Sequence, residues 1–492
     1  MKRILIANRD EIAVRIIRAC RILSLEPVVI FSKKDMTNMH VRLADDAYYL
    51  GDGDVFDTYM NINKILDAID ALNVDAVHPG YGFLADNPIF AEKVIHKGKI
   101  WIGPSPQTLT ILGDKLNAQK LALESGFEII PHSRKIITNY SEAEECAKQL
   151  GFPLVIKPLR GRAGKGLFVV KSIDNLKTAF RDALYETQRT LGHQQVFFQK
   201  FLPSCRIIEF DFLVDKYGNI LNLFDRECTI QYRFQRLFEE APSTILTDEV
   251  RHSIGEKIKK LVKKSNYFQV GTVEFVFTDK KLLFNEINTS IHVEHPVSEM
   301  ITGVDVVVEQ LRMAQGKPLE YSQESFRYLG HAFEMKIKAT DSTNYLKPSP
   351  GVLKELHIPG GLHVRFDTAL DRGCVISSDY DSLIGKLIIW DQKREKTRNK
   401  ALTAIQELGI SGFPTNIAFH RHLLNHPDLI QGILTTDFIE RSHILEEIQE
   451  EYRAIVSALF AVNKHTSKVV LPKMTQTRWR EQQRRESTGW MP

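Results

Sequence analysis

Short apolar runs alternate with helical patterns near the start of the chain, and this alternation limits the fold more than any other feature. An apolar run at residues 3–7 is followed by apolar residues at helical spacing over Ile12–Cys20, and then by a second run at 27–31. The order is repeated by a helical pattern at 62–72 and a run at 76–78. Such alternation is typical of βαβ units, so we expect a parallel sheet covered by helices.

The sequence becomes richer in strand-type residues after about residue 112, where a helical pattern at 117–123 leads into a series of apolar runs. The clearest runs lie at residues 153–157, 207–214, 220–224, 270–277 and 282–287. A polar turn at 278–281 separates the last two runs, which predicts a β-hairpin. Beyond residue 330, strand patterns alternate with a helical pattern near 396–408, which predicts a further unit of helices and strands.

Composition narrows the classes of function. The 492 residues carry a net charge of +4, which is small for this length, so we expect no nucleic-acid partner. The five cysteines are scattered and lack C-x-x-C spacing, which indicates a reducing compartment and argues against disulfides or a zinc site. No apolar run approaches the roughly 20 residues of a membrane span, and the start MKRILIANRD does not resemble a signal peptide. We therefore expect a cytoplasmic protein with no membrane partner.

Three oxygen-bearing side chains on the expected hairpin predict a divalent-cation site. Glu286 and Asn288 are two residues apart, so they share one face of a strand, and Glu274 can lie opposite them on the partner strand. A few protein oxygens combined with phosphate and water suit Mg²⁺. The alternative is a solvated strand face that carries acidic side chains, and this segment alone leaves that alternative open.

Two lysines and a carboxylate form a second group of candidates. Lys157 ends an apolar run and precedes the glycine-bearing loop 160–166, so this lysine and the loop amides can hold phosphate together with Lys115. The alternative for Lys157 is a solvated lysine at a hairpin turn. Glu294 can stand beside bound phosphate as a general base, or it can be a hydrogen-bonded loop carboxylate.

These groups occur in longer strings that resemble the biotin carboxylase family of ATP-grasp enzymes, the ATP-using component of acetyl-CoA, acyl-CoA and pyruvate carboxylases. The strings include ILIANRDEIAVRIIRAC, HPGYGFLADNPIFAE, IGPSPQTLTILGDK, RECTIQYRFQRLFEEAP and NEINTSIHVEHPVSEMITGVDVVVEQL, in order over residues 1–440. The implied architecture is α/β, with an N-terminal βαβ (pre-ATP-grasp) domain at 1–113, an ATP-grasp domain at 114–329 with a mobile lid at about 132–203, a C-terminal α+β domain at 330–441, and a helical appendage with a basic tail at 442–492.

The resemblance also implies roles for particular residues. It implies that the ATP phosphates contact Lys115, Lys157 and the loop glycines Gly164 and Gly166, and that the rest of the nucleotide contacts Gln199, Lys200, Leu202 and Gln231. It implies that Mg²⁺ or Mn²⁺ is held by Glu274, Glu286 and Asn288. It implies that Glu294 deprotonates bicarbonate, while Arg236 and Lys336 contact bicarbonate and the biotin enolate.

Several positions depart from the family pattern where the chemistry is most exacting. Ser290 replaces the arginine that grips bicarbonate in the family, and a serine cannot supply a charged bidentate fork. Arg236 and Lys336 keep the charge of the family's residues, but Lys336 lacks a planar fork. Ile207 and Phe234 stand where the family has histidines near the ribose.

In two places this chain has other residues where the family has glycine. The lid loop contains Arg160, Arg162 and Ala163, which admit positive φ less freely than glycine, so we expect closure of the loop to be restricted. Asp10 stands at the opening turn of the first domain, where the family has glycine.

We therefore expect Mg-ATP-dependent carboxylation of biotin with bicarbonate, as the biotin carboxylase component of an acetyl-CoA or acyl-CoA carboxylase. Biotin would sit on a separate biotin carboxyl carrier protein, because the string LPKMT around Lys473 lacks the attachment turn. Carboxyltransferase subunits and a second copy of the chain are the other expected partners. Two alternatives stay open: a catalytically degenerate ATP-binding paralogue that regulates or supports a carboxylase, and an ATP-grasp ligase for another carboxylate.

The C-terminal appendage shows a separate pattern. Apolar residues recur at helical spacing from Leu445 to Leu459, with acidic residues between them. Because such a stripe needs a surface to cover, we expect the appendage to be a docking element.

Overall fold

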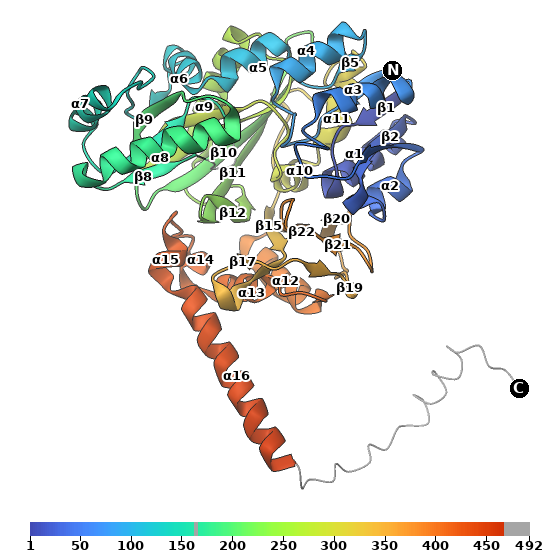
Figure 1. The fold of residues 1–492 in the computed structure, drawn as a ribbon, viewed down its shortest axis with the longest axis vertical. Helices are drawn as coiled ribbons and strands as arrows, with labels where there is room; N and C mark the ends of the chain where they lie inside the picture. The colour runs from blue at the N-terminus through green and yellow to red at the C-terminus, as the bar shows by residue number, and fades with distance from the viewer. Residues whose placement is uncertain (162–165, 467–492) are drawn as a thin grey trace, which may run out of the picture.

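A computed structural model describes residues 1–161 and 166–466, which form three packed lobes and one projecting helix (Figure 1). The first lobe is a five-stranded parallel sheet in the order β3-β2-β1-β4-β5, as the alternating pattern predicts. Its strands are β1 (Arg3–Ile6), β2 (Glu26–Ser32), β3 (Asp46–Gly51), β4 (Ala76–His78) and β5 (Ile100–Trp101). Its helices are α1 (Asp10–Ile22), α2 (Met39–Leu43), α3 (Ile62–Ala71), α4 (Pro88–His96) and α5 (Pro106–Gly113), with the short 3-10 helix Lys33–Asp35.

A nine-stranded sheet forms the centre of the molecule, in the order β20-β22-β15-β12-β11-β10-β13-β14-β6. Its strands are β6 (Glu128–Ile129), β10 (Arg206–Val214), β11 (Ile220–Tyr232), β12 (Gln235–Ala241), β13 (Gln269–Thr278), β14 (Lys281–Asn288), β15 (His331–Lys338), β20 (Val364–Thr368) and β22 (Leu383–Asp391). The packed helices are α6 (Lys115–Glu124), α9 (Asp248–Lys264), α10 (His295–Thr302) and α11 (Val306–Ala314). Because β12 pairs with β15, the sheet continues without a break across residue 330.

Strand β11 is longer than the sequence pattern predicts. The expected strand ends at Phe224, because charged residues follow it, whereas the observed strand continues to Tyr232. The charged residues stay in the strand because their charges are paired inside the molecule: Asp225 with Arg251 at 2.5 Å, and Glu227 with Arg206 at 2.6 Å. Buried charges of this kind are tolerated where they are paired.

A smaller unit, the lid unit (residues 132–203), lies beside the central sheet on the left of Figure 1. It consists of a three-stranded antiparallel sheet, β8-β7-β9, and two helices. The elements are α7 (Tyr140–Leu150), β7 (Leu154–Pro158), β8 (Phe168–Val170), α8 (Ile173–Leu191) and β9 (Val196–Lys200).

The C-terminal lobe surrounds the outer strands β15, β20 and β22 of the central sheet and contains the largest apolar core. Its helices are α12 (Arg394–Glu407), α13 (Ile417–Asn425), α14 (Pro427–Gln431) and α15 (Phe438–Ser442), with the 3-10 helix Ser342–Asn344. Its short strands are β16 (Thr340–Asp341), β17 (Lys347–Pro348), β18 (Gly351–Val352), β19 (Glu355–His357), β21 (Val375–Ile376) and β23 (Gly409–Ser411). Helix α16 (Ile444–Thr466) projects from this lobe (Figure 1).

One buried carboxylate joins three parts of the fold. Glu299 of α10 contacts Arg15 of α1 at 2.9 Å and Arg365 of β20 at 2.7 Å. Burial would raise the pKa of Glu299, but the two guanidinium groups lower it well below its usual range. The three segments therefore meet through an ionised carboxylate on α10, the helix that begins directly after Glu294.

No helix within the two described segments is both long enough and apolar enough to cross a membrane.

Candidate active site

The central sheet brings two of the three candidate metal ligands face to face. Glu274 of β13 is directly opposite Glu286 of β14, and Asn288 lies two residues further along β14. Glu274 and Asn288 are buried, whereas Glu286 is partly exposed. The hairpin therefore presents three oxygen-bearing side chains on neighbouring strands, as the spacing predicts.

Two opposed carboxylates need a cation, and the structure places one beside each. Arg236 forms an ion pair with Glu274, and the Lys115 Nζ lies 2.7 Å from Glu286 Oε2. Burial raises the pKa of Glu274 to about 7, and the neighbouring carboxylates Glu286 and Glu209 add to the rise although Arg236 opposes it. Like charges directly opposite on a sheet are destabilising, so a divalent cation suits this donor set well.

The two candidate phosphate-binding lysines approach this hairpin from different elements. Lys115 begins α6 and donates to Gly161 O at 3.2 Å, so it joins the glycine loop to Glu286. Lys157 lies on β7 of the lid unit and donates to Asn285 Oδ1 at 3.0 Å. Burial lowers the pKa of Lys157 to about 8, and Lys115 contributes to the decrease. Two mutually repelling cations beside carboxylates indicate a place for polyphosphate with its metal.

The candidate base Glu294 lies among cations. Its carboxylate forms a hydrogen-bonded ion pair with Lys336, and Arg236 Nη1 lies 3.6 Å away. Burial would raise the pKa of Glu294, but Lys336, Arg236 and His292 lower it well below its usual range. Lys336 also contacts Glu239 at 3.0 Å, and burial raises the pKa of that carboxyl to about 7. Arg236 contacts both Glu274 and Glu294, so it joins the metal candidates to the base.

A buried group that the sequence pattern did not predict lies beside Glu294. Glu209 of β10 is opposite Glu274 on β13 and contacts Arg226 at 2.6 Å and Arg236 at 2.5 Å. His292 Nδ1 lies 3.2 Å from Glu209 and 3.7 Å from Glu294. A signal was present, because a carboxylate inside the apolar run 207–214 must find a buried partner.

The remaining predicted residues lie around this centre. The nucleotide candidates Gln199 and Lys200 are on β9, Leu202 follows that strand, and Gln231 on β11 pairs with Arg236. Leu202 and Ile207 both pack against a small apolar cluster that contains Val276 of β13. Gly166 is described at φ 73°, whereas Gly164, Arg162 and Ala163 lie outside the described residues.

Two departures from the family pattern occupy unusual backbone positions. Phe234 lies in the turn between β11 and β12 at φ 63° and is 40% exposed, so its ring is largely in contact with solvent. Asp10 begins α1 at φ 61°, a conformation that aspartate tolerates better than most residues. Arg9 pairs with Asp10 at 3.2 Å and lies 4.3 Å above the ring of Tyr380, which connects this turn to the C-terminal lobe.

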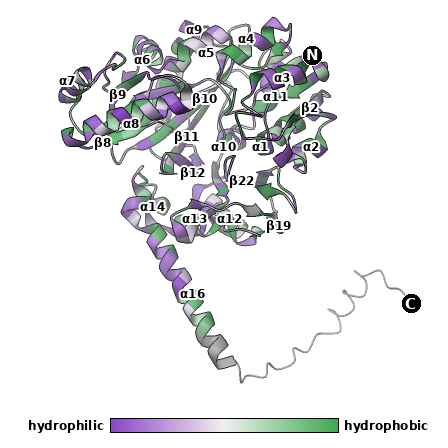
Figure 2. Cartoon of the chain, viewed as in Figure 1, coloured by the Kyte–Doolittle hydropathy of each residue, from purple (hydrophilic) through white to green (hydrophobic). Residues whose placement is uncertain are grey.

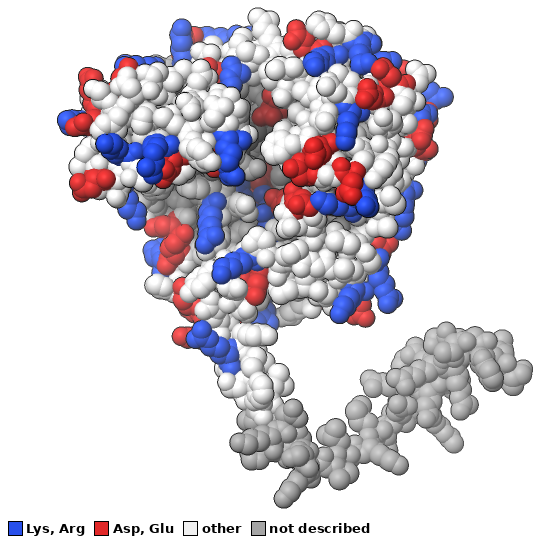
Figure 3. Space-filling model, in the orientation of Figure 1, with Lys and Arg blue, Asp and Glu red and all other residues white. Residues whose placement is uncertain are grey.

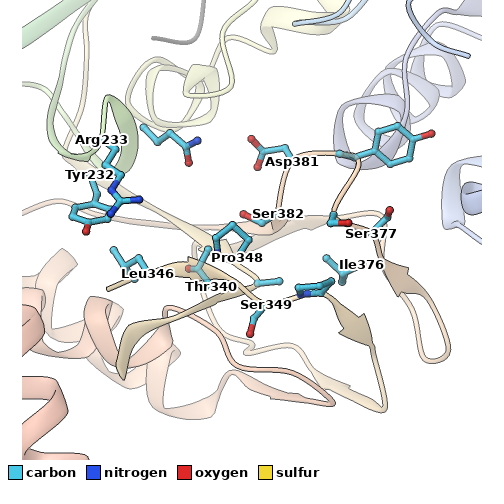
Figure 4. A pocket seen from close by; sticks show the side chains of 15 residues that line it. Tyr232, Arg233, Thr340, Leu346, Pro348, Ser349, Ile376, Ser377, Asp381 and Ser382 are labelled. Atoms are coloured by element: carbon cyan, nitrogen blue, oxygen red, sulfur yellow. The ribbon is translucent and has the colours of Figure 1, made fainter. Parts of the chain in front are cut away.

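A pocket of about 260 Å³ opens between the tip of the β11–β12 hairpin and residues 377–382 (Figure 4). Its rim residues Gln235 and Asp381 contact Lys338 Nζ at 3.1 and 3.3 Å, and Lys338 lies two residues from Lys336 on β15. The buried Thr340 Oγ1 lines the pocket and has no hydrogen-bond partner within the described chain. A hollow between the lobes carries acidic side chains inside, with basic side chains on one side of its rim and acidic ones on the other (Figure 3).

Models of protein families match the described lobes. Residues 1–109 match the family model described as biotin carboxylase, N-terminal domain. Residues 114–322 match the carbamoyl-phosphate synthase L chain, ATP binding domain, and residues 334–441 match the biotin carboxylase C-terminal domain. The central sheet, the lid unit and these matches define an ATP-grasp protein.

Similar proteins show to which family of ATP-grasp proteins the chain belongs. The biotin carboxylase of Nostoc sp. is 39% identical over 439 residues, which are 89% of this chain and 98% of that protein. The 2-oxoglutarate carboxylase small subunit of Hydrogenobacter thermophilus is 37% identical over 94% of this chain and 98% of that protein. The chain belongs to the biotin carboxylase family.

A solved structure agrees with this assignment. The biotin carboxylase domain of the Hydrogenobacter thermophilus 2-oxoglutarate carboxylase, a dimer in complex with MgADP, ADP and bicarbonate, has a TM-score of 0.88 and 38% identity. The similarity covers 90% of this chain and 98% of that one. The predicted α/β architecture with an ATP-grasp domain is thus confirmed.

Proposed function

We propose that this protein carboxylates biotin with bicarbonate and Mg-ATP, as the biotin carboxylase component of a carboxylase. One observation carries the proposal: Arg236 contacts both the metal candidate Glu274 and the base candidate Glu294. The nucleotide end and the carboxylation end of the site are therefore connected by one guanidinium group. A bound metal would supply charge neutralisation at the phosphates, held by Glu274, Glu286 and Asn288.

One group of residues in the site binds the ATP phosphates, and a second group acts on bicarbonate and biotin. Lys115 and Lys157 hold and orient the phosphates, because both reach the hairpin that carries the metal candidates. Glu294 accepts the proton of bicarbonate, since it is ionised and contacts both Arg236 and Lys336. Lys336 and Arg236 stabilise the anions.

The ion pairs of Glu294 make it a weak base until substrates arrive. Lys336 and Arg236 hold its pKa low, so the carboxylate has little affinity for a proton. A bicarbonate on Arg236 and a biotin oxygen on Lys336 compete for these cations and thereby raise the basicity of Glu294. The base becomes effective only when both substrates are present, which limits wasteful cleavage of ATP.

The carrier of biotin is another chain. We infer that its biotinyl arm reaches Lys336 past the pocket beside Lys338, because the rim contacts of Lys338 lie two residues from Lys336. Carboxyltransferase subunits and a second copy of this chain complete the proposed assembly, and the Hydrogenobacter thermophilus domain is itself a dimer. All five cysteines are buried free thiols, which supports a cytoplasmic location.

A carboxylase of 2-oxo acids is a second candidate for the assembly, beside the acetyl-CoA or acyl-CoA type. Residues 1–441 are 441 of the 492 residues, or about 90%, so the 94% match to the 2-oxoglutarate carboxylase small subunit must extend into α16. The match to the Nostoc biotin carboxylase covers 89% of the chain. A sequence match that extends into α16 favours an assembly of the 2-oxo acid type.

Bicarbonate-dependent release of ADP tests the proposal, with free biotin as the acceptor. A biotin carboxylase releases ADP faster when bicarbonate and biotin are both added. A catalytically degenerate paralogue binds nucleotide and releases none, and a ligase for another carboxylate responds only to its own acid. Either of these two results would overturn the proposed activity.

Mg-ATP should raise the melting temperature of the protein by about 2 °C or more, because a ligand that binds only the folded state stabilises it. The double variant Glu286→Lys with Asn288→Lys should abolish this rise, since it replaces two metal ligands by cations. Differential scanning fluorimetry with millimolar Mg-ATP measures both.

The matched control is Glu145→Lys with Gln149→Lys, which makes the same charge changes on the exposed face of α7. The control variant should show the same rise in melting temperature with Mg-ATP as the parent protein. A parent protein whose melting temperature does not respond to Mg-ATP would contradict nucleotide binding itself.

A further inference from the structure

The pocket between the β11–β12 hairpin and residues 377–382 offers hydroxyl groups that the described chain does not use. Thr340 on its wall is only 6% exposed, and its Oγ1 has no hydrogen-bond partner among the described residues. Ser349, Ser378 and Ser382 line the same pocket, and their side chains form no hydrogen bond within the described segments. Because a buried hydroxyl without a partner is costly, this wall suits a ligand that accepts several hydrogen bonds.

The charged groups of the lining leave one positive charge without a partner. The acidic residue of the lining, Asp381, is paired with Lys338 Nζ at 3.3 Å. Arg233 lines the pocket as well, and its guanidinium lies 5.1 Å from the ring centroid of Tyr232, with no ion pair or hydrogen bond to any described residue. Figure 4 shows Arg233 and Asp381 on opposite sides of the pocket, with Thr340 between them. The unpaired guanidinium favours an anionic ligand.

The rest of the lining is apolar and sets the size of the ligand. Leu346 and Ile376 line the pocket and are each 7% exposed, and Pro348 and Pro350 lie beside them. A bare inorganic ion would leave these side chains uncovered, whereas a short carbon skeleton would cover them. A volume of about 260 Å³ is at the small end of ligand sites, so the skeleton must be short.

The turn that carries Arg233 has an unusual sequence for its shape. Arg233 and Phe234 have φ of 50° and 63°, and Tyr232 pairs with Gln235, so the two residues form a type I′ turn. Asn-Gly is the usual pair at these two positions, and bulky side chains there are strained. Such strain is found at places where a ligand is clamped, and here it fixes the side chain that bears the unpaired charge.

We propose that this pocket binds a small organic anion, either a carboxylate or a phosphate ester on a short carbon skeleton. The Arg233 guanidinium binds the anionic group, and the hydroxyls of Thr340 and of the three serines donate hydrogen bonds to the oxygens of the ligand. Leu346 and Ile376 cover its carbon atoms. The site does not depend on the proposed function, because none of these side chains was given a role in it.

The position of the pocket keeps it separate from α16 and close to the carboxylation end of the candidate site. The lining contains no residue of α16, and the apolar outer part of that helix projects away from the C-terminal lobe (Figure 2). Gln235 lines the pocket and precedes Arg236 on β12, while Thr340 follows β15, the strand of Lys336. A bound anion would therefore add contacts between the chain segments that position Arg236 and Lys336.

Three probes that share a carbon skeleton test the class of ligand. Glycerol is neutral, glycerate carries a carboxylate, and glycerol 3-phosphate carries a phosphate. Isothermal titration of the full-length protein with each probe measures the affinity. Arg233→Gln removes the unpaired charge, and Thr340→Val removes the unpaired hydroxyl with little change of shape. The matched control is Lys216→Gln, which removes another exposed cation over a tyrosine ring, 5.1 Å from the centroid of Tyr217 and outside the pocket.

We expect at least one of the two anions to bind the parent protein, and glycerol to bind at least about tenfold more weakly, because it lacks the charge. Arg233→Gln should weaken binding of the anion at least about tenfold, and Thr340→Val about threefold. Lys216→Gln should bind as the parent does. The better of the two anions identifies the ligand as a carboxylate or a phosphate ester. Without a probe, Thr340→Val should unfold at the same temperature as the parent or a higher one, since the hydroxyl that it removes has no partner.

Three results would overturn the proposal. The first is that neither anion binds the parent at millimolar concentration. The second is that the parent and both pocket variants bind the anion equally, which would place it at another cationic site such as Lys115 and Lys157. The third is that glycerol binds as tightly as the anions. Release of ADP is not measured in this experiment, so the pocket and the proposed activity can fail separately.

Discussion

Replacing Glu294 with glutamine should lower bicarbonate-dependent release of ADP by about a hundredfold or more. A positioned general base commonly contributes 10²–10⁴-fold, and glutamine has the shape of the side chain without a proton-accepting charge. The variant should fold, because Lys336 keeps its contact with Glu239 at 3.0 Å when Glu294 loses its charge. Steady-state rates with free biotin, at saturating Mg-ATP, measure the loss.

Two controls separate a catalytic effect from a structural one. The melting-temperature rise with Mg-ATP should survive in Glu294→Gln, since the metal and phosphate candidates are untouched. Glu447→Gln, an exposed change on α16, should leave the rate unaltered. If Glu294→Gln keeps more than a third of the parent rate, the proton of bicarbonate goes to another group, and Glu209, which contacts His292 together with Glu294, is the next carboxylate to test.

Replacing Ser290 with arginine should raise bicarbonate-dependent release of ADP by about tenfold or more. Ser290 is buried, and in the chain it lies two residues after the metal candidate Asn288 and two residues before His292. An arginine at this position should therefore add a charged planar donor to the anion site. One charge-assisted hydrogen bond contributes about 1.5–3 kcal/mol, and 1.36 kcal/mol corresponds to a factor of ten in rate. Adding Arg162→Gly should increase the rate further, because glycine admits positive φ more freely than arginine.

Two further substitutions at position 290 show whether the effect of Ser290→Arg on the rate comes from the size or from the charge of the new side chain. Ser290→Met adds comparable bulk without charge and should not raise the rate. Ser290→Lys adds charge without the planar fork and should give a smaller gain than arginine. If the arginine variant folds, still responds to Mg-ATP in its melting temperature and shows no response to bicarbonate, the missing arginine is not what limits the protein.

The sequence predicted the local parts of the site well. Residues two apart on a strand share a face whatever surrounds them, so the pairing of Glu274 with Glu286 followed from the hairpin alone. The position of Lys157 at the end of an apolar run likewise placed it on β7, beside the glycine loop. Both depend on short-range geometry.

Contacts between distant strands could not be predicted in the same way. The contact of Lys336 with Glu294 and the pairing of Glu209 with Arg226 depend on the order and register of strands that lie far apart in the chain. Strand β11 was predicted too short for the same reason, since its charged residues are stabilised by partners on other elements. A sequence shows that a buried charge needs a partner, but not which strand supplies it.

The continuity of the central sheet across residue 330 has a consequence for how this protein can be divided. β12 pairs with β15 through residues 238–241 and 332–335, so separating the chain at this junction leaves these two stretches of strand edge unpaired. Exposed edges recruit strands from other molecules and cause aggregation. We therefore expect each half of the chain, produced alone, to aggregate through this strand edge and not to behave as an independent domain.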